Sequence, residues 1–72
     1  MKLKDRDCRK GTRIELKEDC KRFGDYYHKG KIGTITKVDI DSRIYDGFHA
    51  VWVAFDDGDY GYFKAENLRR FR

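Results

Sequence analysis

The chain has 72 residues, of which 42% are charged, 39% hydrophobic and 15% aromatic. A chain of this length supports one small core, and its aromatic content is too high for a disordered segment, so we expect a single folded domain. No apolar run approaches the roughly 18 residues of a membrane span, and the first residues are too polar for a secretory signal. These features exclude a membrane protein and favour a cytoplasmic location.

Positive charge is concentrated toward the two ends of the chain. Residues 1–37 carry twelve Lys and Arg against six Asp and Glu, a net charge of +6, whereas residues 38–66 carry two against seven, a net charge of −5; residues 67–72 add +3. If the chain ends meet, as in most small barrels, they form one positive surface opposite an acidic one. Such a surface suits docking on a phosphate backbone or an acidic protein. The alternative is a mixed charged surface that serves solubility.

The two cysteines, Cys8 and Cys20, are separated by eleven residues. With His28 and His49 they lack the paired short spacing that holds structural zinc, so we expect no metal and no other cofactor. Ordinary small reduced residues are the favoured interpretation of both cysteines, and a single disulfide between them is the alternative in an oxidising compartment.

Residues 1–10 are dense in charge and are expected to form a charged, solvated N-terminal arm, so the folded domain is assigned to residues 11–72. The first strand is expected at 12–17, because Ile14 and Leu16 alternate with charged residues and define one buried face.

Residues 18–30 have neither a helical nor a strand period and are expected to form a long loop. In the strand that follows, the β-branched Ile35 and Val38 are three positions apart, so the side-chain alternation must slip once between them, at a bulge or a sharp bend. Gly30 and Gly33 fit a strand that leaves a tight turn and coils, because such a strand needs positions without a Cβ.

The strongest strand is expected at 48–55, after a polar loop at 39–47, because it is rich in β-forming residues. Its alternate residues divide between two faces. The core face is expected to hold Val51, Val53 and Phe55. The outer face is expected to hold Ala50, Trp52 and Ala54, with the large indole at the surface.

The acidic segment 56–59 predicts a hairpin turn in which Gly58 supplies the positive φ that such turns need. A fourth strand is expected at 60–63, a single 3₁₀ turn at 65–68, and a short fifth strand at 69–71 that closes the sheet. The predicted fold is therefore all-β, a small five-stranded barrel with one short 3₁₀ turn near the C-terminus.

Three segments carry a resemblance to a known family: GTRIEL at 11–16, KGKIGTITKV at 29–38 and VWVAFDDG at 51–58. With the long first loop, the bent glycine-marked strand and the acidic hairpin, they resemble an SH3-like small barrel of the KOW and Tudor-like type. The chain departs from KOW domains in its 18–28 insertion and its 39–49 loop. The resemblance implies an SH3-like barrel over residues 11–72 and, as a function, ribosomal RNA or transcription-complex binding.

Catalytic groups do not converge in this sequence. No Ser or Cys stands beside a His in a recognisable motif, no phosphate-binding loop is present, and a hairpin turn already explains the acidic residues at 56–59. We therefore expect a protein that is not an enzyme and that takes no small-molecule substrate.

A nucleic-acid-binding module is the leading functional hypothesis, for either RNA or DNA. The basic residues expected to contact phosphates are Arg13, Arg22, Lys29, Lys31 and Lys37. The aromatic residues expected to offer a stacking platform or an interface are Tyr26, Tyr27 and Trp52. Stacking on such rings contributes about 1–3 kcal/mol per base.

Two alternatives use the same aromatic residues. The first is a protein-interaction barrel that binds or inhibits a larger, nucleic-acid-processing protein, and the short length is typical of a phage or mobile-element reading frame. The second is a Tudor-like reader in which Trp52, Tyr60 and Tyr62 form a cage for a methylated cation. Against all three stands the structural interpretation that these rings cap the ends of a small core.

Overall fold

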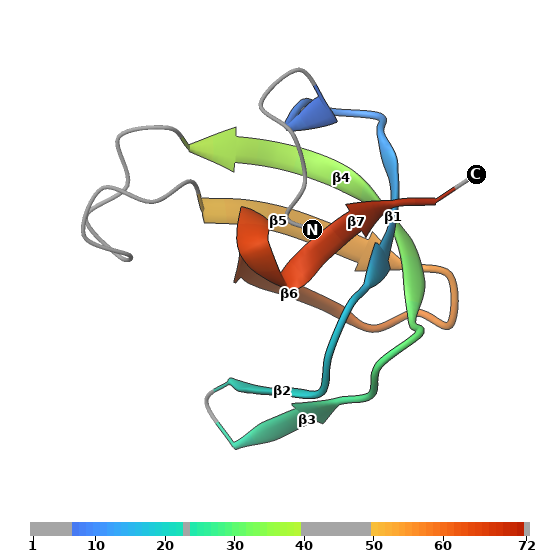
Figure 1. The fold of residues 1–72 in the computed structure, drawn as a ribbon, viewed down its shortest axis with the longest axis vertical. Helices are drawn as coiled ribbons and strands as arrows, with labels where there is room; N and C mark the ends of the chain where they lie inside the picture. Colours follow the sequence, from blue (N-terminus) through green and yellow to red (C-terminus); the bar gives the residue numbers. More distant parts are fainter. Residues whose placement is uncertain (1–6, 23, 40–49, 72) are drawn as a thin grey trace.

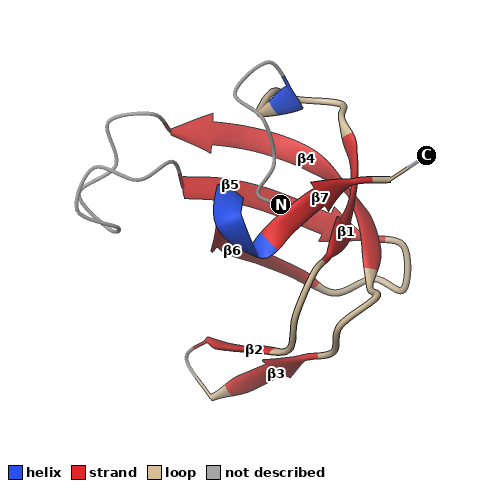
Figure 2. Ribbon diagram, in the orientation of Figure 1, coloured by secondary structure: helices blue, strands red, loops and turns tan. Residues whose placement is uncertain are grey.

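The computed structural model describes residues 7–22, 24–39 and 50–71 (Figure 1). These residues form seven strands and a 3₁₀ turn, and none of them lies in an α-helix, which confirms the all-β prediction (Figure 2). The elements in chain order are β1 (Arg13–Leu16), β2 (Cys20–Arg22), β3 (Asp25–Tyr27), β4 (Ile32–Asp39), β5 (Ala50–Phe55), β6 (Tyr60–Lys64), η3 (Ala65–Asn67) and β7 (Leu68–Arg70). The described part of the chain contains no helix that is long and apolar enough to cross a membrane.

Five strands form one antiparallel sheet in the order β6-β5-β4-β1-β7. The strands predicted around 12–17, 60–63 and 69–71 correspond to β1, β6 and β7, and the predicted 3₁₀ turn is η3. Strand β5 begins at Ala50, and residues 40–49, which hold most of the predicted 39–47 loop and the start of the predicted 48–55 strand, lie outside the described residues.

The prediction of an irregular loop at 18–30 was wrong in part, because β2 and β3 form a separate two-stranded sheet within it. Cys20 pairs with Tyr27 in this hairpin, and Gly24 in the turn has a φ of +85°. Strands of three residues are too short to produce a visible period of two. The hairpin extends away from the larger sheet in Figure 1, while its base contributes two side chains to the core.

The core lies on the inner face of the larger sheet. Val53 and Phe63 are fully buried there, as are the β1 residues Ile14 and Leu16, in agreement with the predicted alternation. The remaining members of the core cluster are Cys20, Tyr27, Ile35, Val51, Phe55 and Leu68. Ala50, expected on the outer face of β5, is also fully buried.

Strand β4 contains the predicted slip in alternation. The pairing of β4 with β5 shifts register between Ile35 and Lys37, so Ile35 is buried and Val38 packs against the core from the same side. Gly33 lies close to β5, since an added Cβ would come within 2.6 Å of the Ala54 carbonyl oxygen. Both features were expected from the sequence and follow from the tight coiling of the sheet.

The two ends of the described chain meet across β1, because this strand pairs with β7. Residues 7–10, assigned to a solvated arm, contact the domain: Cys8 packs against the core, and the Asp7 carboxylate lies 3.7 Å from the Arg70 guanidinium in β7. The segment before β1 is therefore fixed to the sheet close to the end of β7.

Candidate nucleic-acid interface

The outer face of the sheet carries a cluster of Lys37, Trp52 and Tyr62, which we call the Trp52 cluster. Lys37 in β4 and Tyr62 in β6 are the two cross-strand partners of Trp52 in β5. The Lys37 Nζ lies 5.0 Å from the centroid of the indole, and the Tyr62 ring centroid lies 5.7 Å from it at a tilt of 34°. A cation and two aromatic rings are thus held side by side.

The bulge in β4 creates this cluster. Under strict alternation after the buried Ile35, Thr36 would face outward and Lys37 inward. The register shift instead puts Lys37 opposite Trp52 and returns Val38 to the core side. The Thr36 hydroxyl donates to the Trp52 carbonyl at 3.4 Å. The irregularity that the sequence predicts therefore decides which basic side chain stands over the indole.

A second row of cross-strand partners lies beside the Trp52 cluster on the same face. Its central side chains are small or polar, and the side chain at its edge is aromatic. Thr34 pairs with Ala54, and Ala54 pairs with Tyr60, whose side chain is 64% exposed. Arg13 is the partner of Thr34 on the other side and donates to its hydroxyl at 2.9 Å. This row extends the Trp52 cluster into a partly aromatic stripe across the sheet.

Arg13, predicted to contact phosphate, already holds a carboxylate. Its guanidinium donates to both Asp56 oxygens, at 2.7 and 2.6 Å. The hydrogen bonds from Arg13 lower the pKa of the Asp56 carboxyl, and those to Asp56 raise the pKa of Arg13. The paired fork matches the geometry with which arginine binds a phosphate, so Asp56 competes with any phosphate for this side chain.

Lys31 is occupied in the same way. Its Nζ donates to Asp57 at 2.6 Å and to Asp59 at 2.5 Å, and the side chain is only 15% exposed. Burial lowers the pKa of Lys31, but the hydrogen bonds to the two carboxylates raise it by more than burial lowers it. The net shift of the Lys31 pKa is therefore upward. The ammonium also lies 5.1 Å from the centroid of the Phe55 ring. Lys31 therefore links two carboxylates of the hairpin turn between β5 and β6.

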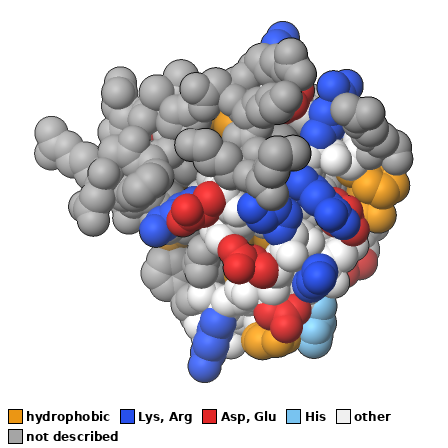
Figure 3. Space-filling model, viewed as in Figure 1, with side chains coloured by type: hydrophobic (Ala, Val, Ile, Leu, Met, Phe, Trp, Pro, Cys, Tyr) orange, Lys and Arg blue, Asp and Glu red, His pale blue; other side chains and the backbone are white. Residues whose placement is uncertain are grey.

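The acidic turn at 56–59 is the expected hairpin turn, with Gly58 at a φ of +97° and the Asp59 N–H bonded to Asp57 Oδ1 at 3.0 Å. Its second role was missed from the sequence. The turn neutralises two of the five basic residues that were expected to contact phosphate, Arg13 and Lys31. On the face of the molecule in Figure 3, basic and acidic side chains are interspersed, as expected for a mixed charged surface.

The β2–β3 hairpin region holds the other predicted residues. Tyr26 is 54% exposed, and its hydroxyl hydrogen bonds to Asp19, which raises the pKa of Tyr26. The Lys29 N–H donates to the same carboxylate at 2.7 Å, so Asp19 links Tyr26 in β3 to the turn that follows the strand. Arg22 lies in β2, and its side chain is outside what the structure describes.

Tyr27 is not an exposed platform, contrary to expectation. Its side chain is 6% exposed, packs edge-on against Phe63 at 5.2 Å between ring centroids, and donates from its hydroxyl to the Tyr60 carbonyl at 2.9 Å. Antiparallel pairing with Cys20 turns the ring toward the core. Among the eight predicted side chains, two cation–ring pairs occur within the described residues: Lys37 with Trp52, and Lys31 with the buried Tyr27, whose ring centroid lies 5.8 Å from the Lys31 Nζ.

Tyr62 could have been placed beside Trp52 from the sequence. A hairpin centred on the turn at 56–59 brings residue 62 opposite residue 52, and the observed register has this pairing. No group of three or more His, Cys, Asp and Glu side chains with the geometry of a metal site occurs among the described residues. Comparison with protein-family models, with curated proteins and with solved structures finds no match to this chain.

Proposed function

We propose that this protein is a small, non-enzymatic module that binds single-stranded nucleic acid, RNA or DNA, on the outer face of β4, β5 and β6. The contact between Lys37 and Trp52 is the observation that carries the proposal. An aromatic ring beside a cation offers a base a stacking surface and a phosphate a counter-charge, the combination that recurs in binding of single strands. The cytoplasmic location expected from the sequence is part of the same proposal.

The fold of this module is, in our proposal, an SH3-like barrel of the KOW and Tudor-like type. The support is the strand order β6-β5-β4-β1-β7, in which the last strand pairs with the first after a 3₁₀ turn. The bulged β4 and the hairpin between β5 and β6 agree with the same architecture.

Binding of a base requires Lys37 to move from the indole. A cation over a half-buried ring such as that of Trp52 contributes between about 0.5 and 2 kcal/mol, whereas stacking of one base on such a ring contributes about 1–3 kcal/mol. The exchange is favourable, and the displaced ammonium gains a phosphate. Tyr60, at the exposed edge of the face, offers a second ring one row away.

Fluorescence anisotropy with a labelled single-stranded oligonucleotide at two salt concentrations tests the proposal. Trp52→Ala is expected to weaken binding without changing the salt dependence, because stacking releases no counterions. Lys37→Ala is expected to remove about 0.7 from the slope of log affinity against log salt, the value for one lost phosphate contact on a single strand.

Matched controls come from the β2–β3 region. Tyr26→Ala removes an exposed ring, and Lys29→Ala removes an exposed cation, and neither residue belongs to the Trp52 cluster. Both are expected to bind like the wild type. Absence of measurable binding by the wild type at about 50 mM salt, where electrostatic attraction is weakly screened, contradicts the proposal.

A protein-interaction module is the second candidate, and the exposed Tyr26 on the projecting hairpin favours it (Figure 1). Tyrosine is enriched among residues that dominate protein interfaces. The neutralised Arg13 and Lys31 also weaken a purely electrostatic function. This candidate predicts a complex that tolerates salt and is lost in Tyr26→Ala, the variant that serves as a neutral control above.

A further inference from the structure

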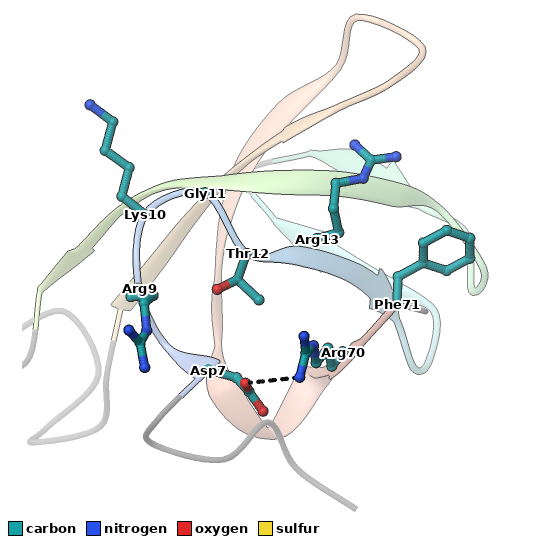
Figure 4. Close-up of a pocket in the computed structure, with 8 residues that line it drawn as sticks. All are labelled: Asp7, Arg9, Lys10, Gly11, Thr12, Arg13, Arg70 and Phe71. Atoms are coloured by element: carbon teal, nitrogen blue, oxygen red, sulfur yellow. Dashed lines mark ion pairs between the residues drawn. The ribbon is translucent and has the colours of Figure 1, made fainter.

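A second basic feature lies where the two ends of the described chain meet. The segment before β1 and the end of β7 line a pocket of about 660 Å³ (Figure 4). This volume is within the range of about 300–1,000 Å³ that is typical of small-molecule sites. None of the residues expected from the sequence to bind nucleic acid lines it except Arg13.

Cationic side chains dominate the lining of the pocket, and they are Arg9, Lys10, Arg13 and Arg70. Two carboxylates oppose them within ion-pair distance: Asp56 lies 2.6 Å from Arg13, and Asp7 lies 3.7 Å from Arg70. Among the described residues, four basic side chains and one acidic side chain, Asp7, thus line the pocket. In Figure 4 the Thr12 hydroxyl and the Asp7–Arg70 pair face the interior, whereas Lys10 extends outward.

Backbone hydrogen bonds fix both walls of the pocket. The segment before β1 turns at Asp7, whose carbonyl accepts from the Arg9 N–H at 2.9 Å, and the Ile35 N–H donates to the Thr12 carbonyl at 2.9 Å. On the other wall the Phe71 N–H donates to the Arg13 carbonyl at 2.9 Å. The backbone of both walls is thus fixed before any ligand arrives, which reduces the entropic cost of binding one.

Phe71 identifies the class of ligand. Its ring is 37% exposed and lies at the edge of the same pocket. Guanidinium groups bind phosphate through paired hydrogen bonds, and an exposed ring stacks on a base. We propose that the chain-end pocket binds a nucleotide, with its phosphate against Arg9, Arg70 and the Thr12 hydroxyl and its base against Phe71. The phosphate belongs either to a free nucleotide or to the end of a strand.

Titration of the ¹⁵N-labelled full chain with adenosine monophosphate, followed by NMR, tests the proposal. Saturable shifts are expected at the amides of residues 10–12 and 71. Inorganic phosphate alone is expected to shift the amides of 10–12 with lower affinity, because it lacks the base. Absence of saturable shifts at these amides with the nucleotide overturns the proposal.

Two neighbouring arginines of β7 give a matched pair of variants. Arg70 lines the pocket, whereas Arg69 bonds to Glu15 at 2.7 Å outside it, and both side chains are largely exposed. Arg70→Gln is expected to weaken binding of the nucleotide at least about threefold, as loss of a charge-assisted contact does, and Arg69→Gln less than about twofold. Equal losses in the two variants overturn the proposal.

The role of the ring has its own test, because Phe71→Leu keeps an apolar side chain. This variant is expected to weaken binding of adenosine monophosphate and to leave inorganic phosphate unchanged. Equal effects on both ligands contradict stacking on Phe71 and overturn the assignment of a nucleotide.

Oligonucleotides with and without a 5′-phosphate distinguish the two sources of the phosphate. Preference for the phosphorylated strand supports a strand end, and shifts at the pocket with the mononucleotide alone support a free nucleotide. Trp52→Ala is expected to leave binding at the pocket intact. The inference therefore stands or fails separately from single-strand binding on the Trp52 cluster.

Discussion

Arg13 and Asp56 are 43 positions apart in the chain, and their side chains form a paired hydrogen bond on the surface. Opposite charges at this distance favour the ionised form of the carboxylate in the folded state. The pKa of Asp56 is accordingly below its ordinary value of 3.8. The folded chain therefore binds this proton less tightly than the unfolded chain does, so the free energy of unfolding depends on pH.

The Asp56→Asn variant tests this linkage. Because the folded pKa is lowered, the stabilisation by Asp56 is fully present above its ordinary pKa of 3.8, which applies to the unfolded chain, and is lost as the pH falls through the folded value. We expect Asp56→Asn to be less stable than the wild type at pH 7, with a difference that vanishes under strong acid. Thermal unfolding from pH 7 to pH 2 measures it. A difference that does not shrink as the pH falls would contradict the ion pair as the cause.

Strand β4 contains two features that fit it to β5. Gly33 permits an approach that any Cβ would block, since its nearest atom would be a backbone oxygen 2.6 Å away. Two positions beyond the buried Ile35, the bulge exchanges the faces of Lys37 and Val38. The extra residue of the bulge thus allows Val38 to pack against the core and Lys37 to contact Trp52.

Deletion of Thr36 tests the bulge. Without Thr36, strict alternation from the buried Ile35 leaves Lys37 on the outer face opposite Trp52 and Val38 on the core face opposite Val51, so no charge is buried. We therefore expect the deletion variant to keep cooperative thermal unfolding, measured by circular dichroism. Thr36→Ala keeps the residue count and removes one weak hydrogen bond, so it should unfold cooperatively. Loss of cooperative unfolding in the deletion variant would contradict the assignment of Thr36 as the extra residue of the bulge.

In the folded molecule, positive and negative charges are less separated than they are along the sequence. Its formal charge is +4, and the sequence separates a basic first half from an acidic second half. In the folded state the acidic turn at 56–59 lies against Arg13 and Lys31 and neutralises them. Nonspecific attraction to a polyanion is therefore weaker than the count of Lys and Arg predicts.

Release of Arg13 should strengthen that attraction. Asp56→Asn and Asp25→Asn each raise the net charge by one, but only the first frees Arg13. We expect Asp56→Asn to bind single-stranded oligonucleotides more tightly and to steepen the salt slope by about 0.7, the value for one added phosphate contact. Anisotropy titrations at two salt concentrations measure both. Equal gains in the two variants would assign the effect to net charge and contradict competition at Arg13.

The sequence by itself determined the features that depend on neighbouring positions. Alternation at Ile14 and Leu16 identified β1, the three-residue spacing of Ile35 and Val38 identified the bulge, and the glycine-containing acidic segment identified the hairpin between β5 and β6. Each is a local rule of strand geometry, so no distant contact is needed to infer it. The contact of Trp52 with Lys37 and Tyr62 follows from the bulge and the hairpin register together.

Only the tertiary structure decided which side chains remain available to a ligand. Tyr27 and Tyr26 are adjacent in the chain, yet one is buried and the other exposed, because β2 and β3 are too short to reveal which face meets the core. The neutralisation of Arg13 depends on a residue 43 positions away, and the chain-end pocket depends on the pairing of β1 with β7. Such charge pairs and pockets arise from the approach of distant segments, which composition and spacing do not specify.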